Sequence, residues 1–458
     1  MSLSPDQILK LQARTPRYTS YPTAPVWRSD IPPQVEAEAL GRVSSPASVY
    51  VHLPFCAEQC SFCACHQVVS GRREAGDRYL HALARQIETL PLPQEPVTVE
   101  RIHLGGGTPT WYGDEDLDTL LTALRRRLRF PGPDEQGHGE LDVEVDPEIT
   151  TDAQVDGLAH LGATRISMGV QSFDPGVLEA VGRPQRSERI GAILERAHSH
   201  GMRGLNMDLM YGLPRQLPEV FARDLDQTIA LKPDRLAIFG YAHVPWLKPH
   251  QKRLEAYGLP SAELRLELFY MAHERMRAAG YVPIGFDHFA RPQDELAIAA
   301  REGRLHRNFM GYTTRPDLEL VGLGMSAISD LKDSYFQQLT KLGDWWKAAE
   351  QGQPTLEKAL LLSPEDKLRR DVINRIMCNL SIRWADVAAR WGIDPKEHFA
   401  LAWERLKPLQ DLGLCTMTDE ALEVTEDGRV LVRNIASAFD AYLAAPGEQT
   451  SPRFSQAI

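Results

Sequence analysis

The sequence predicts an α/β protein: a partial (β/α)6 TIM-like barrel with an N-terminal arm and a mainly helical, winged-helix-like C-terminal domain. Three observations support this fold class. Short apolar segments alternate with amphipathic helical segments, and parallel strands need such crossover helices. Cysteine, glycine and polar residues come directly after the apolar segments, where barrels place their functional loops. Beyond about residue 290 the alternation fades and helical patterns dominate.

The barrel strands are predicted in chain order from short apolar runs. The first, Ser48–Leu53, is stopped by Pro54, and a helix over 75–90 follows, with apolar residues three and four positions apart. Further strands are expected at 99–104, 141–145, 165–170, 205–210 and 235–239, with helical patterns between them, and an apolar run at 281–286 follows another helix. Repeated strand–helix units of this kind favour a curved partial barrel over a flat sheet.

The remainder of the chain divides by composition. With 458 residues, two or three domains are expected. We predict an arm without its own core at 1–45, the barrel at 46–290, a connecting segment over the active site at 291–370, and a C-terminal helical domain at 371–458. Helical patterns occur at 344–349, 364–378, 384–391 and 398–412, and two short strands at 415–418 and 422–425 form a hairpin, typical of a winged helix.

Charge and hydropathy exclude several classes of function. The net charge of −11 argues against a nucleic-acid partner and favours a cap or docking role for the C-terminal domain. An anionic substrate must then be captured by local cations. No apolar run approaches the roughly 18 residues of a membrane span, and no leader pattern is visible, so we expect a cytoplasmic protein without a membrane partner.

The cysteines predict metal or redox chemistry. Four of the six fall within ten positions, and crowding of this kind is no disulfide framework. The thiolates of Cys56, Cys60 and Cys63 suffice to hold three irons of a [4Fe–4S] cluster and leave one iron open to a ligand. Structural zinc, completed by His52 or His66, is the alternative.

The two other cysteines, Cys378 and Cys415, stand alone in the sequence. We predict that both are buried apolar thiols.

The spacing of the three cysteines, with Phe62 before the third, resembles the signature of radical S-adenosylmethionine enzymes. In that family the open iron binds the methionyl part of S-adenosylmethionine, which is cleaved to a 5′-deoxyadenosyl radical. The glycine-rich turn Gly105–Pro109 follows a predicted strand, and glycines there permit close approach to a ligand. Behind a cysteine loop, this turn is similar to the family's site for the methionyl ammonium group.

Across almost the whole chain, the resemblance narrows to the oxygen-independent coproporphyrinogen III oxidase family. The stretches that carry it are Arg17–Thr23, Tyr50–Cys56, Phe62–Cys65, Gly105–Thr110, Glu144–Pro147, Ser167–Gln171, Asn206–Pro214, Asp287–Pro292, Leu305–Thr314 and Gly322–Ser329. Departures fall at side positions of the loop, Ser61, Ala64 and His66, and remove no ligand. The resemblance implies oxidative decarboxylation of two propionates to vinyl groups, giving protoporphyrinogen IX. The alternative is a haem chaperone-like relative, which lacks the cysteine that this chain has at position 65.

The resemblance also implies a set of site residues and cofactors. A [4Fe–4S] cluster on Cys56, Cys60 and Cys63 and two molecules of S-adenosylmethionine are expected, with Cys65 as a catalytic residue in the wall of the site. The residues expected to contact S-adenosylmethionine are Tyr50, Phe62, Gly106, Gly107, Thr108, Glu144, Gln171, Arg183, Asp208, Ala242 and Ile328. Of these, Arg183 suits a carboxylate, because its planar fork binds in bidentate fashion.

Substrate and partners follow from the same resemblance. Coproporphyrinogen III carries four propionates, and the candidate cations for them are Arg291, Arg307, His288 and His306. An electron donor such as flavodoxin or ferredoxin is expected, and the protein is expected to be a monomer. The proline-rich arm around Tyr18–Pro25 is a candidate to close over the site.

Overall fold

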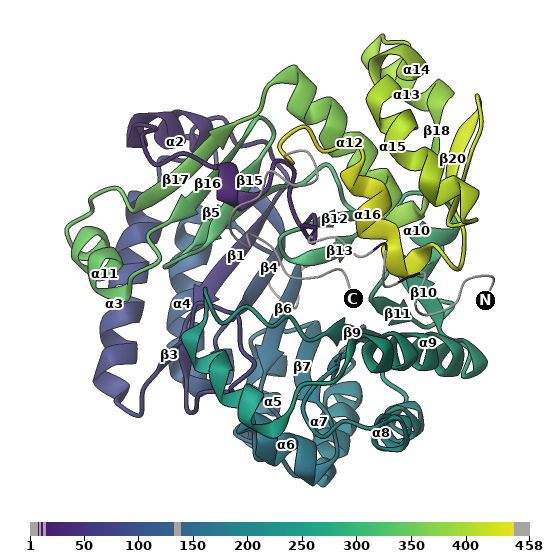
Figure 1. The fold of residues 1–458 in the computed structure, drawn as a ribbon. Helices are drawn as coiled ribbons and strands as arrows, with labels where there is room; N and C mark the ends of the chain where they lie inside the picture. The colour runs from purple at the N-terminus through teal and green to yellow at the C-terminus, as the bar shows by residue number, and fades with distance from the viewer. Residues whose placement is uncertain (1–7, 9–10, 12–14, 132–138, 444–458) are drawn as a thin grey trace.

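One large twisted sheet forms the centre of the molecule (Figure 1). The structure is a computed structural model that describes residues 8, 11, 15–131 and 139–443. The middle of the sheet consists of six parallel strands that lie side by side in chain order: β1 (Ala47–Leu53), β4 (Val97–Gly106), β6 (Glu140–Val145), β7 (Arg165–Gln171), β8 (Asn206–Tyr211) and β9 (Arg235–Gly240). All six coincide with predicted strands, so the predicted α/β barrel class is confirmed.

Helices connect these strands and cover the outer face of the sheet. They are α3 (Arg73–Thr89), α4 (Asp114–Arg127), α5 (Asp152–His160), α6 (Pro175–Val181), α7 (Ser187–Ser199), α8 (Pro218–Leu231) and α9 (Ala262–Ala278). Their apolar stripes are fully buried, as Tyr79, Leu83 and Ile87 of α3 illustrate. Burial of these stripes against the sheet supplies most of the driving force for the barrel core.

The apolar run 281–286 does not form one strand. It contains β10 (Val282–Ile284), which turns back at Gly285 (φ +56°) into β11 (His288–Ala290), and β11 pairs antiparallel with β9. The connection is too short for a parallel crossover, so the edge of the sheet is closed by a hairpin instead.

The stretch after this hairpin extends the sheet beyond β1. Strand β14 (Glu319–Leu323) pairs parallel with β1, and β15 (Ile328–Leu331), β16 (Ser334–Gln338) and β17 (Leu356–Leu361) follow antiparallel. None of these four strands was predicted, because β14, β15 and β16 follow one another without the intervening helices that mark the barrel strands. The same stretch contains α10 (Glu295–Arg301), a hairpin of β12 (His306–Asn308) and β13 (Gly311–Thr313), and α11 (Leu342–Glu350).

The N-terminal arm packs against this extension rather than forming its own core. Arg28 exchanges backbone hydrogen bonds with Ala359 of β17, and the Trp27 ring stacks on Tyr335 at 5.0 Å between centroids. The arm contains η1 (Ala24–Val26) and α2 (Pro33–Leu40). Tyr18 and Tyr21 are buried in the core of the C-terminal domain, so the arm joins two parts of the molecule.

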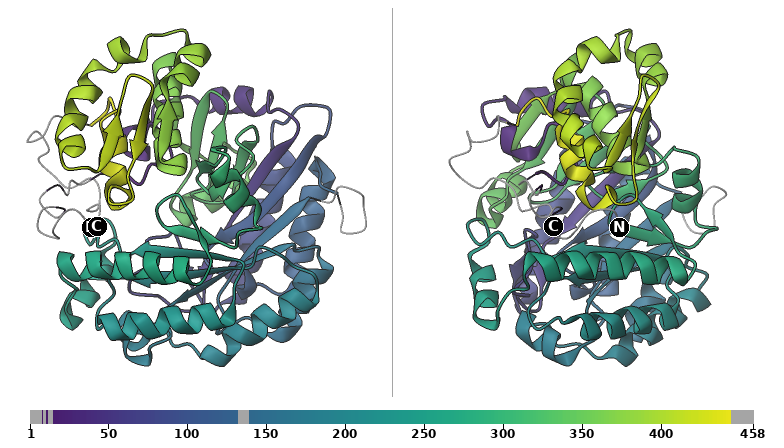
Figure 2. Two further views of the ribbon diagram at one scale, coloured as in Figure 1. Left: turned by 90° about the vertical axis from the view of Figure 1, so that its right-hand side faces the viewer. Right: turned by 45° about the vertical axis from the view of Figure 1, so that its right-hand side comes forward.

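The C-terminal domain is mainly helical (Figure 2). It comprises α12 (Pro364–Asn379), α13 (Trp384–Trp391), α14 (Pro395–His398), α15 (Ala400–Asp411), η4 (Arg429–Leu431), α16 (Val432–Ser437) and a small antiparallel sheet of β18 (Ser381–Arg383), β20 (Ala421–Val424) and β19 (Cys415–Met417). The predicted hairpin is β19–β20, and β18 was not predicted. Cys378 and Cys415 are each 2% exposed, which confirms both as buried thiols.

Within the described part of the chain, no helix combines the length and the apolar character needed to cross a membrane.

Candidate functional site

The register of β1 and β4 brings two predicted loops together. Leu53 pairs with Gly106, so the cysteine loop that leaves β1 lies beside the glycine-rich turn that ends β4. The backbone N–H of Gly107 donates to the Leu53 carbonyl at 2.9 Å, and that of Thr108 donates to the Phe55 carbonyl at 2.8 Å. A Cβ on Gly107 would lie 2.5 Å from the backbone of Pro54, so only glycine permits this approach.

Side chains from a neighbouring segment hold the cysteine loop. This segment includes η3 (Pro249–Tyr257), and the loop itself contains the paired strands β2 (Phe55–Cys56) and β3 (Val68–Val69). Gln251 Nε2 donates to the Phe62 carbonyl at 2.9 Å, His250 Nε2 to the Cys63 carbonyl at 2.8 Å, and Lys248 Nζ to the Cys65 carbonyl at 2.8 Å. Three backbone carbonyls of the loop are therefore fixed from outside.

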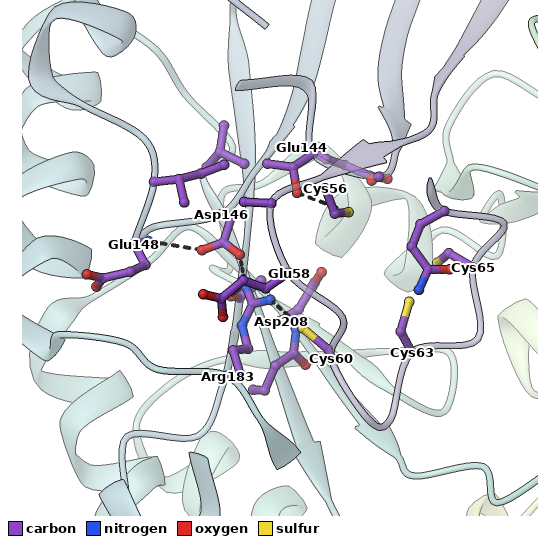
Figure 3. Close-up of a pocket in the computed structure, with 18 of the residues that line it drawn as sticks. Cys56, Glu58, Cys60, Cys63, Cys65, Glu144, Asp146, Glu148, Arg183 and Asp208 are labelled. Atoms are coloured by element: carbon purple, nitrogen blue, oxygen red, sulfur yellow. Dashed lines mark hydrogen bonds and ion pairs between the residues drawn. The ribbon is translucent and has the colours of Figure 1, made fainter. Parts of the chain in front are cut away.

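The cysteines border a cavity of 240 Å³ at the carboxyl ends of the parallel strands (Figure 3). Cys56, Cys60, Cys63 and Cys65 line it together with the glycine-rich turn. Among the described residues, no three His, Cys, Asp or Glu side chains converge closely enough to hold a single metal ion.

The donor set fits an iron–sulfur cluster that leaves one iron open. The three predicted ligands border a cavity whose lining also includes carboxylates, glycine backbone, Arg183 and the fourth thiol, Cys65, so a ligand has room beside a cluster. Burial raises the pKa of Cys56 to about 12 and also raises the pKa of Cys60, so metal binding at neutral pH must release thiol protons.

Arg183 connects a predicted cluster ligand to the opposite wall. Its guanidinium donates to Cys60 Sγ at 3.2 Å, to the Gly169 carbonyl at 2.7 Å, and pairs with Asp146 at 3.0 Å. Although burial lowers the pKa of Arg183, the charges of Asp146 and Cys60 raise it overall, so it remains a cation. The role of Asp146 was not predicted, although it stands in the same motif as Glu144.

Glu144 is held by a buried network that was also not predicted. Its Oε2 accepts from the Gly106 N–H at 2.9 Å, and its Oε1 lies 3.0 Å from His103 Nε2. His103 Nδ1 lies 3.6 Å from Asp142. Burial opposes protonation of His103, but the two carboxylates raise its pKa to about 10, and the pKa of Glu144 is lowered in turn. Glu144 is therefore an oriented carboxylate anion with an imidazolium behind it.

The sequence contains a pattern from which this network could have been predicted. Arg101 and His103 alternate on β4, and Asp142 and Glu144 alternate on β6, so polar side chains face inward from both strands. Asp208 on β8 adds a further acid: burial raises its pKa to about 7, and Asn206 donates to its Oδ1 at 2.6 Å.

The structure brings most predicted residues into this one cavity. Those that line it are Cys56, Cys60, Phe62, Cys63, Cys65, Gly106, Gly107, Thr108, Glu144, Gln171, Arg183 and Asp208. Three others are not part of its lining. The Tyr50 hydroxyl forms a hydrogen bond with His52 Nδ1 at 2.9 Å, and its ring stacks on His103. Ala242 follows β9 in the chain. Ile328 is the first residue of β15 and packs beside Trp27 and Tyr335.

The four predicted substrate cations separate into two groups. His288 and Arg307 meet at the buried carboxylate of Asp287, at 2.7 Å and 3.7 Å. Arg291 instead pairs with Asp234 at 3.7 Å and donates to the Pro233 carbonyl, before the start of β9. His306 lines a separate groove that borders α12.

Two families of protein domain match the chain. Residues 50–227 match the Radical SAM superfamily, and residues 362–431 match the HemN C-terminal domain.

Two relatives that match almost the whole chain are both oxygen-independent coproporphyrinogen III oxidases. The oxygen-independent coproporphyrinogen III oxidase of Pseudomonas aeruginosa is 40% identical over 99% of this chain and 98% of its own length, and that of Salmonella typhimurium is 40% identical over 95% and 94%. The solved structure of coproporphyrinogen III oxidase from Escherichia coli, described as a radical SAM enzyme, superposes with a TM-score of 0.88 at 39% identity, covering 93% of this chain and 97% of that one.

Proposed function

The chain belongs to the family of oxygen-independent coproporphyrinogen III oxidases within the radical SAM superfamily, and on this premise we propose that it decarboxylates coproporphyrinogen III oxidatively. Two propionates become vinyl groups, and the product is protoporphyrinogen IX. The observation that carries this function is the 40% identity over 99% of the chain, which spans the barrel and the C-terminal domain together. Fold likeness alone would not identify a substrate.

A [4Fe–4S] cluster and S-adenosylmethionine, when bound, would supply the radical chemistry for removing a hydrogen atom from the propionate β-carbon. The chain's part is to hold and orient these groups and to exclude water and oxygen. In this proposal Cys56, Cys60 and Cys63 bind the irons. Arg183 offsets the negative charge of the cluster through its contact with Cys60.

The carboxylates at the strand ends orient the cofactor. Glu144 is anionic and fixed by Gly106 and His103, so it is suited to accept hydrogen bonds from hydroxyl or ammonium groups. Asp208, on the neighbouring side of the cavity, is suited to the same role toward ribose hydroxyls. Cys65 is the proposed catalytic residue, because its thiol faces the same cavity beside the cluster ligands.

Stoichiometry and partners complete the proposal. Two molecules of S-adenosylmethionine are used, since two propionates react. Each reaction takes up one electron from a carrier such as flavodoxin or ferredoxin, and the propionate then loses CO2 and passes one electron to an acceptor as the vinyl group forms. The enzyme works as a cytoplasmic monomer.

The test is anaerobic turnover by the full chain after iron and sulfide reconstitution. With coproporphyrinogen III, S-adenosylmethionine and a one-electron reductant, chromatography is expected to show mono- and divinyl products, and none without S-adenosylmethionine. Metal analysis is expected to find iron rather than zinc. A protein that binds haem stoichiometrically and forms no vinyl product would instead support the haem chaperone-like alternative.

A further inference from the structure

Two half-buried arginines lie side by side where β9 ends. Arg17 Nη2, from the N-terminal arm, donates to the Gly240 carbonyl at 2.9 Å, and Arg265 Nη2, from the first turn of α9, donates to the Tyr241 carbonyl at 2.9 Å. These carbonyls are consecutive and directly precede Ala242, a predicted contact of S-adenosylmethionine. The two guanidiniums therefore lie at the same end of the sheet as the cofactor cavity.

The position of Arg17 depends on the C-terminal domain. Arg433 of α16 donates to the backbone carbonyls of Thr15 and Pro16, so the residues directly before Arg17 are tied to that domain. Figures 1 and 2 show α16 above β9 and α9. Arm, barrel and C-terminal domain thus all contribute to the placement of one cationic group.

Positive charge in this region exceeds negative charge. Arg307 is 7% exposed and pairs with Asp287 at 3.7 Å, whose carboxylate is already shared with His288. Among the described carboxylates, none forms an ion pair with Arg17 or Arg265. Burial lowers the pKa of Arg17, the charge of Asp287 opposes this in part, and the charge of Arg307 lowers the pKa further. Burial lowers the pKa of Arg265, and the charge of Arg17 adds to that effect.

Two of these arginines also have N–H donors that form no hydrogen bond in the described structure. Nε of Arg265 and Nε of Arg307 are both buried and have no hydrogen-bond partner in the described structure. Withdrawing three guanidiniums from water beside a single shared carboxylate is costly, and an anionic ligand would reduce that cost. In a chain of net charge −11, a local excess of cations is the feature that an anionic substrate requires.

We propose that Arg17, Arg265 and Arg307 form a carboxylate-binding subsite for the propionates of the tetrapyrrole substrate. This inference rests on the proposed function and names the residues that hold the substrate. It replaces Arg291 and His306, which the fold places elsewhere. Planar guanidiniums bind carboxylates in bidentate fashion, so three of them can fix the orientation of the ring.

The subsite suits the propionates that remain on the ring. An ion pair stabilises a carboxylate that is about to be lost as CO2, and that stabilisation disappears in the product. Arginine contacts therefore raise the activation barrier for decarboxylation of a reacting propionate. They have no effect on the barrier when they bind a propionate that is retained. The three arginines are thus anchors, and the reacting side chain lies toward the cysteine loop.

Binding can be tested without turnover. The full chain is titrated with coproporphyrin III, which keeps all four propionates, and with its tetramethyl ester, which keeps the ring but no carboxylate. Arg17→Gln and Arg265→Gln are each expected to weaken binding of the acid by about 10-fold to 100-fold, the worth of a charged hydrogen bond. Binding of the ester is expected to be the same in wild type and variants.

Arg301→Gln is the matched control, because the exposed Arg301 also donates once to a backbone carbonyl, that of Pro292 at 2.9 Å. Arg17→Lys is expected to recover part of the affinity. Cleavage of S-adenosylmethionine without substrate is expected to stay at the wild-type level in Arg301→Gln, and iron content is expected to stay at the wild-type level in all of these variants.

The proposed subsite would be wrong if the glutamine variants bound the acid as tightly as the wild type. It would also be wrong if the variants lost the same affinity for the acid and for the ester. Carboxylate-dependent losses at Arg17 and Arg265 in a protein that forms no vinyl product would support the subsite while contradicting the proposed function.

Discussion

At the scale of single residues, the four cysteines of the loop are expected to differ in role although all line one cavity. Changing Cys56, Cys60 or Cys63 to Ser removes one of three thiolates, and we expect each variant to lose its cluster iron. Cys65→Ser is the matched control: it is expected to keep iron, sulfide and the cluster spectrum but to lose decarboxylation. Iron analysis and EPR of anaerobically reconstituted protein check both expectations. Loss of iron in Cys65→Ser would make Cys65 a ligand, and full activity would make it a packing residue.

His103 gives the stability of the fold a dependence on pH. Its folded-state pKa of about 10 exceeds the ordinary value of 6.5, because the carboxylates of Asp142 and Glu144 outweigh the effect of burial. The stabilisation is therefore fully present below pH 6.5 and is lost as the pH rises through about 10. When the pH is raised from neutral to about 10, the unfolding free energy of the wild type is expected to fall more than that of His103→Gln, as measured by urea titration. Parallel losses in both proteins would contradict the assignment.

At the scale of elements, the close contact between the cysteine loop and the glycine-rich turn depends on Gly107. A Cβ there would meet the Pro54 backbone at 2.5 Å, and a backbone atom cannot rotate away as a side chain can. Gly107→Ala is expected to destabilise the protein by about 1–3 kcal/mol and to lower its iron content, because the two loops must separate. Gly71→Ala, whose Cβ would meet no atom within 4 Å, is the control and should leave thermal unfolding and iron content unchanged.

At the scale of the whole molecule, one buried ion pair joins the C-terminal domain to the sheet. Arg370 of α12 donates to both oxygens of Asp330 on β15 at 2.8 Å and 2.9 Å, and it lies over the Tyr335 ring. Arg370→Met leaves the Asp330 carboxylate buried without a partner, and the expected cost is about 3–5 kcal/mol in unfolding free energy. The double variant Arg370→Met/Asp330→Asn is expected to recover part of that loss. Equal stabilities of all three proteins in urea titrations would show that the pair does not hold the domains together.

Local patterns in the sequence were sufficient for the barrel, and they also predict a set of cluster ligands. Six apolar runs predicted the six parallel strands, because burial between helices and neighbouring strands requires apolar side chains along each strand. The spacing of Cys56, Cys60 and Cys63 predicted the metal chemistry, since loop ligands lie close in sequence as well as in space. The strands β14 to β17 were missed because β14, β15 and β16 have no helices between them, so the strand–helix alternation that indicated the barrel is absent there.

Tertiary structure decided everything that depends on residues far apart in the chain. The pairing of β1 with β4 and of β4 with β6 sets which side chains face one another, and only that register places His103 between Asp142 and Glu144. Arg17 and Arg265 bind consecutive carbonyls because the arm and α9 converge at the end of β9. Sequence alone thus determined the fold class and the placement of four cysteines in one loop. The partners of each buried charge followed from strand register and domain packing, which no local pattern encodes.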